Sequence, residues 1–335
     1  MVDEAPAQLT LADIARLAGV SRSAASRALD VRAPVRGPGA DRVREIAARH
    51  GYVPNAAAAN LRLKRTGLVA VVVPRLTDTV MAMLYESIVT AAAERGYQAT
   101  VMTTDDDPRK EVERGRALLK QRVDGFILTT ARTDGADPFL LELKERRIPF
   151  SLALREDGES MAAVIDDELG GRLAVEHLLA NGHRRIAFIG GPAYASTSQG
   201  RERGYRRAMA DAGIDILAGY VRHSDFSVES GYAIAQELIA LAAVPTAVFT
   251  ANDSLALGVM TAAQRAGIAV PDGLSIVGYN DTPLAPHLAK PLTSVAVPFP
   301  IIAERALGIL LDGGGPAPEP AAPHLVVRGS VASLI

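Results

Sequence analysis

The chain has 335 residues, of which 48% are hydrophobic, with no cysteine and a formal net charge of −2. This length suffices for two or three domains, and the lack of cysteine excludes disulfides, thiolate metal sites and a cysteine nucleophile. The sequence holds no uncharged apolar run long enough to cross a bilayer, and its start, MVDEAPAQ, lacks the apolar stretch of a secretory signal, so we expect a cytoplasmic protein.

The low net charge conceals a difference along the chain. Residues 1–66 hold 11 Lys and Arg against 6 Asp and Glu, so this segment is basic and the remainder is acidic. A basic segment attracts the phosphates of a nucleic acid, and an acidic remainder limits non-specific adhesion elsewhere.

Two short helices joined by a turn at residues 18–20 are the first predicted elements. Thr10 and Asp13 have the spacing of a capping box, Gly19 allows the backbone conformation that ends a helix, and Ser21 can cap the second helix. That second helix directs alanines inward and cations and hydroxyls outward; the outward set is Arg22, Ser23, Ser26 and Arg27. The layout predicts a helix-turn-helix that reads the DNA major groove, although an ordinary amphipathic helix pair has the same pattern.

A third helix and a conditional fourth helix are predicted to follow. Pro38 suits a first helical turn, and residues 43–52 give the third helix an apolar side. The segment after Asn55 is rich in alanine, but at about nine residues it falls below the roughly 12–15 at which isolated helices become marginal. Leu61 beside Arg62 resembles an apolar wedge next to a phosphate or minor-groove contact. An alanine-rich linker with incidental basic residues is the alternative.

From residue 66 the pattern alternates between apolar runs and helical stretches. Continuous apolar runs of this kind are typical of buried parallel strands, and they occur at 68–74, 125–130, 148–154, 185–192, 246–251 and 274–279. Repeated strand–helix units predict parallel sheets with helices on both faces, and roughly 270 residues suggest two such sheets. Ligands of these folds bind at the carboxyl ends of the strands.

Several long motifs in order make the chain resemble the lactose/galactose repressor (LacI/GalR) family of transcriptional regulators. They run from residue 10 to residue 332 and include TLADIARLAGVSRSAASRAL, GYVPNAAAANL, HLLANGHRRIAFIGGP, RERGYRRAM, PTAVFTANDSLALGV and PLTSVAVP. The resemblance implies an all-α three-helix head, a hinge helix, and an α/β core like periplasmic sugar-binding proteins, with two parallel-sheet subdomains.

The same resemblance implies domain boundaries and an assembly. The expected parts are a helix-turn-helix domain at 1–54, a hinge helix and linker at 55–65, a first subdomain at 66–165 with 293–317, and a second at 166–292 with 318–335. The crossings between the subdomains would then lie near Asp166, Leu292 and Pro318. No heptad segment follows residue 332, so a homodimer is expected rather than a tetramer.

In the head, the resemblance assigns operator choice to Arg22 and Ser23, with Arg27 one turn further on. Arg22 can pair bidentately with guanine, which favours a guanine-bearing half-site. The full set of expected DNA-binding residues is Thr10, Ser21, Arg22, Ser23, Ser26, Arg27, Arg36, Asn55, Leu61 and Arg62. Ala24-Ala25 and residues 36–39 depart from the family pattern, and Arg36 is a cation added there.

In the core, the resemblance assigns a small-molecule effector to the cleft between subdomains. The expected contacts are Thr77, Asp78, Val80, Met81, Thr129, Arg201, Phe226, Asn252 and Asn280. A guanidinium with two amides suits vicinal hydroxyls, so a sugar or sugar derivative is the favoured effector. Many relatives have an Asp at the positions of Asn280 and Leu154, so an acidic effector such as a sugar phosphate or uronate is the alternative. Structural roles are also open: either asparagine could cap a helix, and Arg201 could form a surface ion pair.

These observations together predict a sequence-specific DNA-binding regulator, most simply a repressor, that binds a palindromic operator as a dimer under effector control. A periplasmic-type solute-binding protein without a DNA role is the alternative, but it would not need a basic helical head. The segment FIGGPAYAS lacks the spacing of a dinucleotide-binding loop, and the six histidines form no ligand cluster in sequence. We therefore expect no catalysis, no cofactor and no metal.

Overall fold

The computed structural model describes residues 9–29, 35–52, 66–135, 137–313 and 316–335. Contacts divide the chain into two compact units, Met1–Gly67 and Leu68–Ile335, which we call the head and the core. The expected hinge helix and linker at 55–65 lies outside the described residues, and so do the DNA contacts expected from Asn55, Leu61 and Arg62.

Three helices form the described part of the head: α1 (Leu11–Ala18), α2 (Arg22–Ala28) and α3 (Pro38–Arg49). The capping box is confirmed, because the Asp13 N–H donates to Thr10 Oγ1 at 3.3 Å and the Thr10 N–H donates to the Asp13 carboxylate at 3.0 Å. Gly19 ends α1 with φ of +68°, and Ser21 Oγ accepts from the Ala24 N–H at 3.2 Å to begin α2. The local signals of a helix-turn-helix are therefore all present.

Small side chains fill the centre of the head. The buried cluster consists of Ile14, Ala15, Ala18, Ala25, Ala28, Val43 and Ala47. Because most of these are alanines, the three helices can approach closely and still exclude water. Arg44 donates to the carbonyls of Ala28 and Val35 at 3.0 and 3.2 Å, which fastens α3 to the end of α2.

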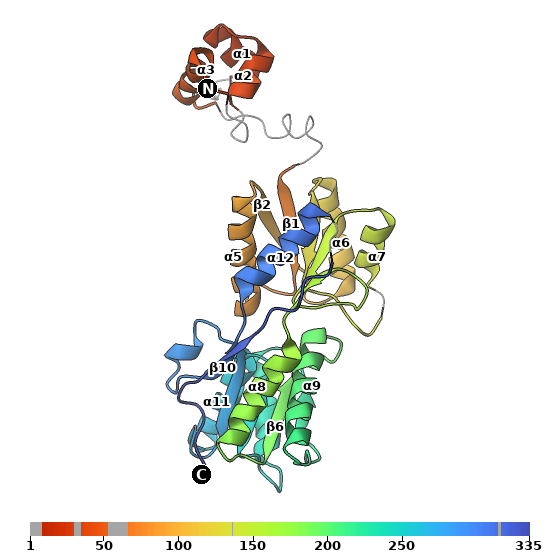
Figure 1. The fold of residues 1–335 in the computed structure, drawn as a ribbon, viewed down its shortest axis with the longest axis vertical. Helices are drawn as coiled ribbons and strands as arrows, with labels where there is room; N and C mark the ends of the chain where they lie inside the picture. The colour runs from red at the N-terminus through yellow and green to blue at the C-terminus, as the bar shows by residue number, and fades with distance from the viewer. Residues whose placement is uncertain (1–8, 30–34, 53–65, 136, 314–315) are drawn as a thin grey trace, which may run out of the picture. The chain divides into compact units, whose positions relative to one another are not determined.

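The first lobe of the core is a parallel sheet with the order β2-β1-β3-β4-β5. Figure 1 labels β1 and β2 of this sheet and the helices around it. Its strands are β1 (Leu68–Val73), β2 (Gln98–Thr103), β3 (Gly125–Leu128), β4 (Phe150–Ala153) and β5 (Ala162–Ala163), and its helices are α5 (Thr79–Glu94), α6 (Pro108–Lys120), α7 (Pro138–Glu145) and α12 (Phe299–Asp312). Alternate residues of β1 and β3 belong to two separate hydrophobic clusters, so both faces of the sheet are covered.

The second lobe is a sheet with the order β11-β10-β9-β8-β6-β7, in which only β11 runs antiparallel. Its strands are β6 (Ile186–Gly190), β7 (Val221–His223), β8 (Ala247–Thr250), β9 (Ser275–Asn280), β10 (Thr293–Ala296) and β11 (His324–Val326), and its helices are α8 (Asp167–Ala180), α9 (Ser196–Asp211), α10 (Val228–Ile239), α11 (Asp253–Arg265) and the 3-10 turn η1 (Ala285–His287). Helices α8 and α9 touch through glycine: a Cβ at Gly171 would lie 2.3 Å from the Arg201 carbonyl oxygen. The expected two-sheet core is confirmed.

One expected boundary is wrong. We placed residues 293–317 in the first subdomain, with a crossing near Leu292, but Thr293–Ala296 pair with β9 as strand β10 of the second lobe. A short β-rich run fits either sheet, and only its hydrogen-bond partner decides between them. The crossing therefore follows Ala296, and α12 then packs in the first lobe against α5 and β4.

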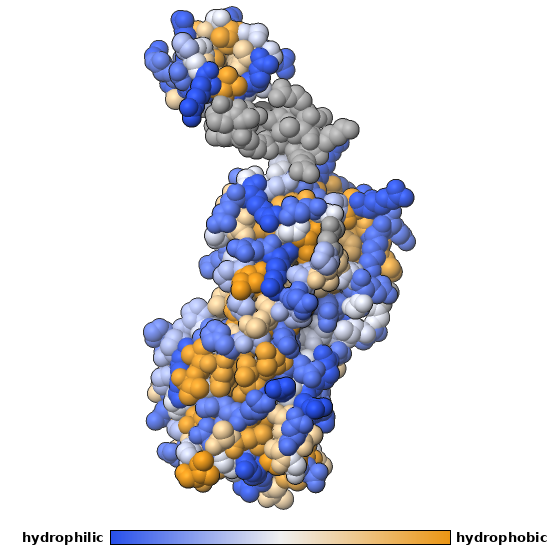
Figure 2. All heavy atoms as spheres, viewed as in Figure 1, coloured by the Kyte–Doolittle hydropathy of each residue, from blue (hydrophilic) through white to orange (hydrophobic). Residues whose placement is uncertain are grey.

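The surface of the core is mostly polar, but apolar residues gather on the face of the second lobe that Figure 2 shows. Large apolar side chains exposed in this lobe include Leu284 and Val327, at 57% and 59%. Among the described residues, no helix combines the length and the apolar character needed to cross a bilayer.

Candidate functional site: an exposed helix in the head and a cleft in the core

The outer face of α2 presents two cations that have no partner among the described residues. Arg22, Ser23 and Arg27 are exposed, as is Ser21 at the cap, and Ser26 is half-buried. Within the described part of the chain, neither Arg22 nor Arg27 has a hydrogen-bond or ion-pair partner. Arg27 and Arg36 both line a small groove of about 190 Å³ beside the start of α3, so the structure brings these two predicted residues together.

Thr10 is exposed, but its hydroxyl already serves the cap of α1. Thr10 Oγ1 donates to the Asp13 carboxylate at 2.6 Å. The hydrogen bonds from Thr10, together with that from Arg16, lower the pKa of Asp13 to about 2. Thr10 therefore has a structural role whether or not it also touches DNA.

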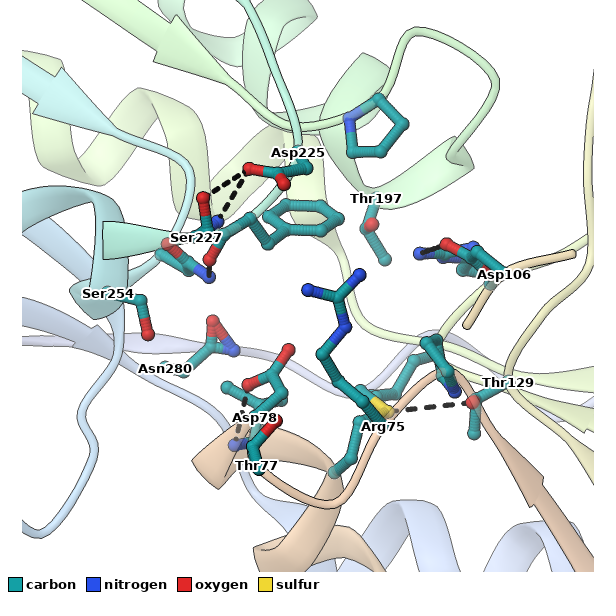
Figure 3. Close-up of a pocket in the computed structure, with 18 of the residues that line it drawn as sticks. Arg75, Thr77, Asp78, Asp106, Thr129, Thr197, Asp225, Ser227, Ser254 and Asn280 are labelled. Carbon is teal, nitrogen blue, oxygen red and sulfur yellow. Dashed lines mark hydrogen bonds and ion pairs between the residues drawn. The ribbon is translucent and has the colours of Figure 1, made fainter. Parts of the chain in front are cut away.

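The core holds a cavity of about 510 Å³ lined by both lobes (Figure 3). Its walls are the segments that follow the carboxyl ends of the strands, as expected for this class of sheet. Every residue that we expected to contact an effector lines this cavity: Thr77, Asp78, Val80, Met81, Thr129, Arg201, Phe226, Asn252 and Asn280. The structure thus brings together side chains that lie far apart in the sequence.

Arg201 is held by a buried ion pair. Its side chain is 5% exposed, its Nε donates to Asp167 Oδ1 at 2.8 Å, and its guanidinium lies 3.7 Å from the centre of the Tyr279 ring. A further nitrogen donates to the Ala251 carbonyl. Burial raises the pKa of Asp167, and the adjacent Arg201 opposes that rise. The surface ion pair that we kept open for Arg201 is therefore wrong, because its partner lies inside the second lobe.

The two asparagines of the cavity differ. Asn252 caps α11, because its Oδ1 accepts from the Leu255 N–H at 2.8 Å, and its Nδ2 donates to the Phe226 carbonyl at 3.0 Å. Asn280 caps none of the described helices, and its Oδ1 is buried without a hydrogen-bond partner among the described residues. A buried acceptor without a partner costs about 1–3 kcal/mol, so Asn280 is the amide free to meet a ligand.

First-lobe residues at the cavity also have roles in their own lobe. Asp78 caps α5 by accepting from the Val80 N–H at 3.0 Å, and burial raises the pKa of its carboxyl. Thr129 Oγ1 donates to the Val72 carbonyl at 3.0 Å, while Val80 and Met81 supply a buried apolar surface.

Our sequence reasoning missed a second buried ion pair. Arg155 donates two hydrogen bonds to Asp106, at 3.0 and 2.9 Å, and Tyr194 Oη donates to the same carboxylate at 3.1 Å. The available signals were the run of aspartates at 105–107 and the charged residues that follow the apolar run at 148–154, although the strand before the aspartates was not itself predicted.

Arg75 is the third arginine of the cavity and was also missed. It is exposed and has no ion-pair partner within the described residues, and Figure 3 shows its side chain reaching into the space between the two lobes. Its positive charge acts on Asp78, Asp105 and Asp225. The walls therefore combine three arginines with five carboxylates, the remaining two being Asp106 and Glu229.

A helix-turn-helix head joined to a two-lobed core with a cleft at its strand ends defines a ligand-responsive DNA-binding regulator. Residues 10–55 match the model of the bacterial regulatory proteins of the lacI family, and residues 175–331 match the periplasmic binding protein-like domain. The chain belongs to the LacI family of transcriptional regulators.

Relatives cover nearly the whole chain. It is 35% identical to the HTH-type transcriptional regulator DegA of Bacillus subtilis over 334 residues, which is 97% of this chain and 98% of DegA. The Lac repressor dimer bound to operator and the anti-inducer ONPF is similar in structure, with a TM-score of 0.84, 26% identity, and coverage of 97% of this chain and 99% of that chain. The CelR–cellobiose complex has a TM-score of 0.73 at 31% identity, covering 96% and 100%.

Proposed function

We propose that this chain represses transcription by binding a palindromic operator as a homodimer, and that an uncharged sugar in the cleft controls that binding. The observation that carries the choice of ligand is the charge of the cavity. Both buried arginines, Arg155 and Arg201, already have a carboxylate partner in the protein.

An acidic effector would be repelled by the carboxylates that line the cavity. Arg75 is the cation available to it, but the carboxylates of Asp78, Asp225 and Glu229 also line the cavity. Hydrogen bonds from Ser227 and Ser230 outweigh burial and lower the pKa of Asp225, so this carboxyl is ionised at neutral pH. Since like charges repel strongly where water is scarce, this argues against a sugar phosphate or uronate.

The neutral features of the cavity suit a sugar. A volume of about 510 Å³ falls within the roughly 300–1,000 Å³ of small-molecule sites. Phe226 offers an apolar ring, and Gly191 leaves room for it, because a Cβ there would lie 2.2 Å from the ring. Asn280 offers an acceptor, and carboxylates accept from hydroxyl donors. The cellobiose bound by a relative is likewise an uncharged sugar.

Control of DNA binding would follow from lobe movement. A ligand that touches both lobes stabilises one arrangement of them, and a coupling of about 1–3 kcal/mol between cleft and operator is enough to change occupancy. Induction is the simpler expectation for a sugar effector. Because a repressor must reach its operator DNA, we infer a cytoplasmic protein, and relatives that are named as regulators support a role without catalysis.

A matched ligand panel tests the charge argument. Thermal shift and calorimetry on the full chain would compare glucose, glucosamine, glucuronate and glucose 6-phosphate, followed by the same comparison for ribose, galactose and cellobiose. We expect a neutral sugar to bind at least about tenfold more tightly than its acidic derivative, a difference of about 1.4 kcal/mol. Tighter binding of the phosphate or uronate would overturn the proposed ligand class.

The DNA part is tested separately. Selection from random duplexes would yield an operator, and fluorescence anisotropy would measure its affinity with and without the sugar that binds. We expect a palindromic consensus with guanine in each half-site, opposite Arg22, and a weaker complex with sugar present. An operator affinity that no binding sugar alters would contradict effector control.

A further inference from the structure

Tyr194 makes contacts across the boundary between the lobes. It follows β6 of the second lobe, yet its carbonyl oxygen accepts from both the N–H and the Oγ1 of Thr133, each at 3.0 Å. Thr133 follows β3 of the first lobe. The Tyr194 hydroxyl donates to Asp106, which follows β2 of the first lobe, at 3.1 Å. The residue is therefore bound to the first lobe at both its backbone and the tip of its side chain.

Charged neighbours strengthen this contact. The Arg132 guanidinium lies 3.5 Å from the centre of the Tyr194 ring, a cation–π contact from the first lobe. Arg132 is itself fixed by Asp134 through hydrogen bonds of 2.9 and 2.7 Å, and Asp106 is fixed by Arg155. Arg132 and Asp106 of the first lobe are therefore already held in place, and they lose little conformational freedom when Tyr194 binds to them.

Two further hydrogen bonds join the lobes next to Tyr194. Gln199 of α9 donates to Thr133 Oγ1 at 2.8 Å, and the Glu156 N–H donates to Ser196 Oγ at 3.0 Å. Burial and the Asp106 carboxylate raise the pKa of Tyr194, so the phenol keeps the proton that it donates. All of these bonds form within the protein itself and need no ligand.

We propose that Tyr194 is a positioning residue that holds the cleft of the ligand-free protein partly closed. Cavity walls come from both lobes, so a ligand reaches all of its contacts only when the lobes are close together. The contacts of Tyr194 with the first lobe act as a clasp: they favour this arrangement before a ligand binds, and so they remove part of the free-energy cost of closing the cleft. Tyr194, which also lines the cavity, then sets the concentration at which the regulator responds.

The lack of cysteine allows a direct test in the full chain. Exposed Ala117 of α6 and Ala210 of α9 lie on different lobes, and Ala117→Cys with Ala210→Cys would carry the two spin labels. Labelled protein would be mixed with an excess of unlabelled protein, so that each dimer holds at most one labelled chain. Pulsed dipolar spectroscopy without DNA or ligand would then give the distribution of distances between the lobes.

The variants separate the hydroxyl, the ring and simple loss of a tyrosine. Tyr194→Ala should increase the long-distance fraction at least about tenfold, because it removes a hydrogen bond to a charged group and a cation–π contact. Tyr194→Phe keeps the ring and should give an intermediate value. Tyr232→Ala is the matched control, since Tyr232 contacts Arg265 entirely within the second lobe, 5.0 Å from ring centre to guanidinium.

An unchanged distribution in Tyr194→Ala, with a melting temperature showing that the variant is folded, would overturn the clasp. An equal change in Tyr232→Ala would overturn it as well, because the effect would then be general loosening. The distance distribution and the melting temperature are measured without operator DNA or sugar. A failure of the clasp would therefore leave the proposed function untouched, and a failure of the proposed function would leave the clasp untouched.

Discussion

The arginines on the outer face of α2 and the two buried arginines of the cleft are held in opposite ways. Arg22 and Arg27 lie exposed on the outer face of α2 and have no partner in the described residues, whereas Arg155 and Arg201 are buried and bound to carboxylates. An exposed arginine gives up only water when it reaches a guanine or a phosphate. A buried arginine is already paired with a carboxylate of the protein, so its charge is neutralised there before any ligand binds. We therefore expect the exposed pair to serve recognition, whereas the buried pair holds the architecture of the cleft.

The largest expected effect comes from Arg201→Ala. It leaves Asp167 buried without its partner, which should lower the free energy of unfolding of the core by about 3–5 kcal/mol, as measured in urea. The sugar response should also be lost while operator binding is retained at temperatures where the variant is folded. Arg203→Ala, on the same helix but in an exposed pair with Glu168, is the control and should change stability little. A wild-type unfolding curve for Arg201→Ala would show that its pair with Asp167 does not stabilise the core.

Arg22→Ala should have the reverse profile. Operator affinity should fall by about 1–3 kcal/mol with relaxed preference at one base pair per half-site, because a bidentate base contact is lost. Stability should stay within about 0.5 kcal/mol of wild type, as for other exposed surface changes. Arg49→Ala, which removes an exposed ion pair with Glu45 on α3, is the control. Equal weakening on every DNA sequence would show that Arg22 contacts phosphate instead of a base.

The two regions should also differ in their response to pH. Burial, followed by the charge of Asp137, raises the pKa of Glu111 from 4.5 to about 8, whereas hydrogen bonds lower that of Asp13 to about 2. The folded core therefore retains a proton that the unfolded chain releases, and its stability falls as pH rises from about 4.5 to 8. The contribution of Asp13 is instead lost only as pH falls through about 2.

Glu111→Gln should remove this pH dependence. At about 1.4 kcal/mol per pKa unit, it should stabilise the core by about 4 kcal/mol near pH 8 and by less than about 1 kcal/mol near pH 5. Urea unfolding between pH 5 and 8 measures the difference, and Glu113→Gln, an exposed neighbour on α6, is the control. Parallel curves for wild type and Glu111→Gln would show that Glu111 is ionised throughout this range.

The smallest expected effect concerns the cap of α1. Thr10→Ala removes the side-chain acceptor for the Asp13 N–H and should lower the stability of the head by about 1 kcal/mol. Amide hydrogen exchange in α1 of the full chain reports this locally, and Thr10→Ser, which keeps the hydroxyl, should restore protection. If protection fell equally in β1 of the core, the head would not be an independent unit.

Local signals explain why the head was predictable. Caps at Thr10 and Ser21 and the glycine at 19 act within one helical turn, so the sequence contains the whole argument. Buried strands such as β1 were also evident as apolar runs. Strand β2 was missed because most of its residues are only half-buried, and β10 was assigned to the wrong lobe because its short run does not specify a partner.

The cleft was predictable only in part. The family resemblance placed every expected effector residue, from Thr77 to Asn280, on one wall or another of a single cavity. It did not give the pair between Arg155 and Asp106, which are 49 residues apart, or the Tyr194 contact with Asp106, which spans 88. Such pairs depend on how loops from different strands meet, and no local pattern encodes that. The same is true of the burial that makes Asp167 the partner of Arg201.

Two of the segments that pass between the lobes are tied together. Ile165 and Ala321 form a parallel bridge, in which the Ala321 N–H donates to the Val164 carbonyl at 2.9 Å and the Asp166 N–H donates to the Ala321 carbonyl at 3.0 Å. Two segments joined by such a bridge resist sliding past one another, but the pair can still twist about its long axis. We therefore expect ligand binding to rotate one lobe relative to the other about this pair of segments. A change that stiffens the pair should abolish the response to ligand.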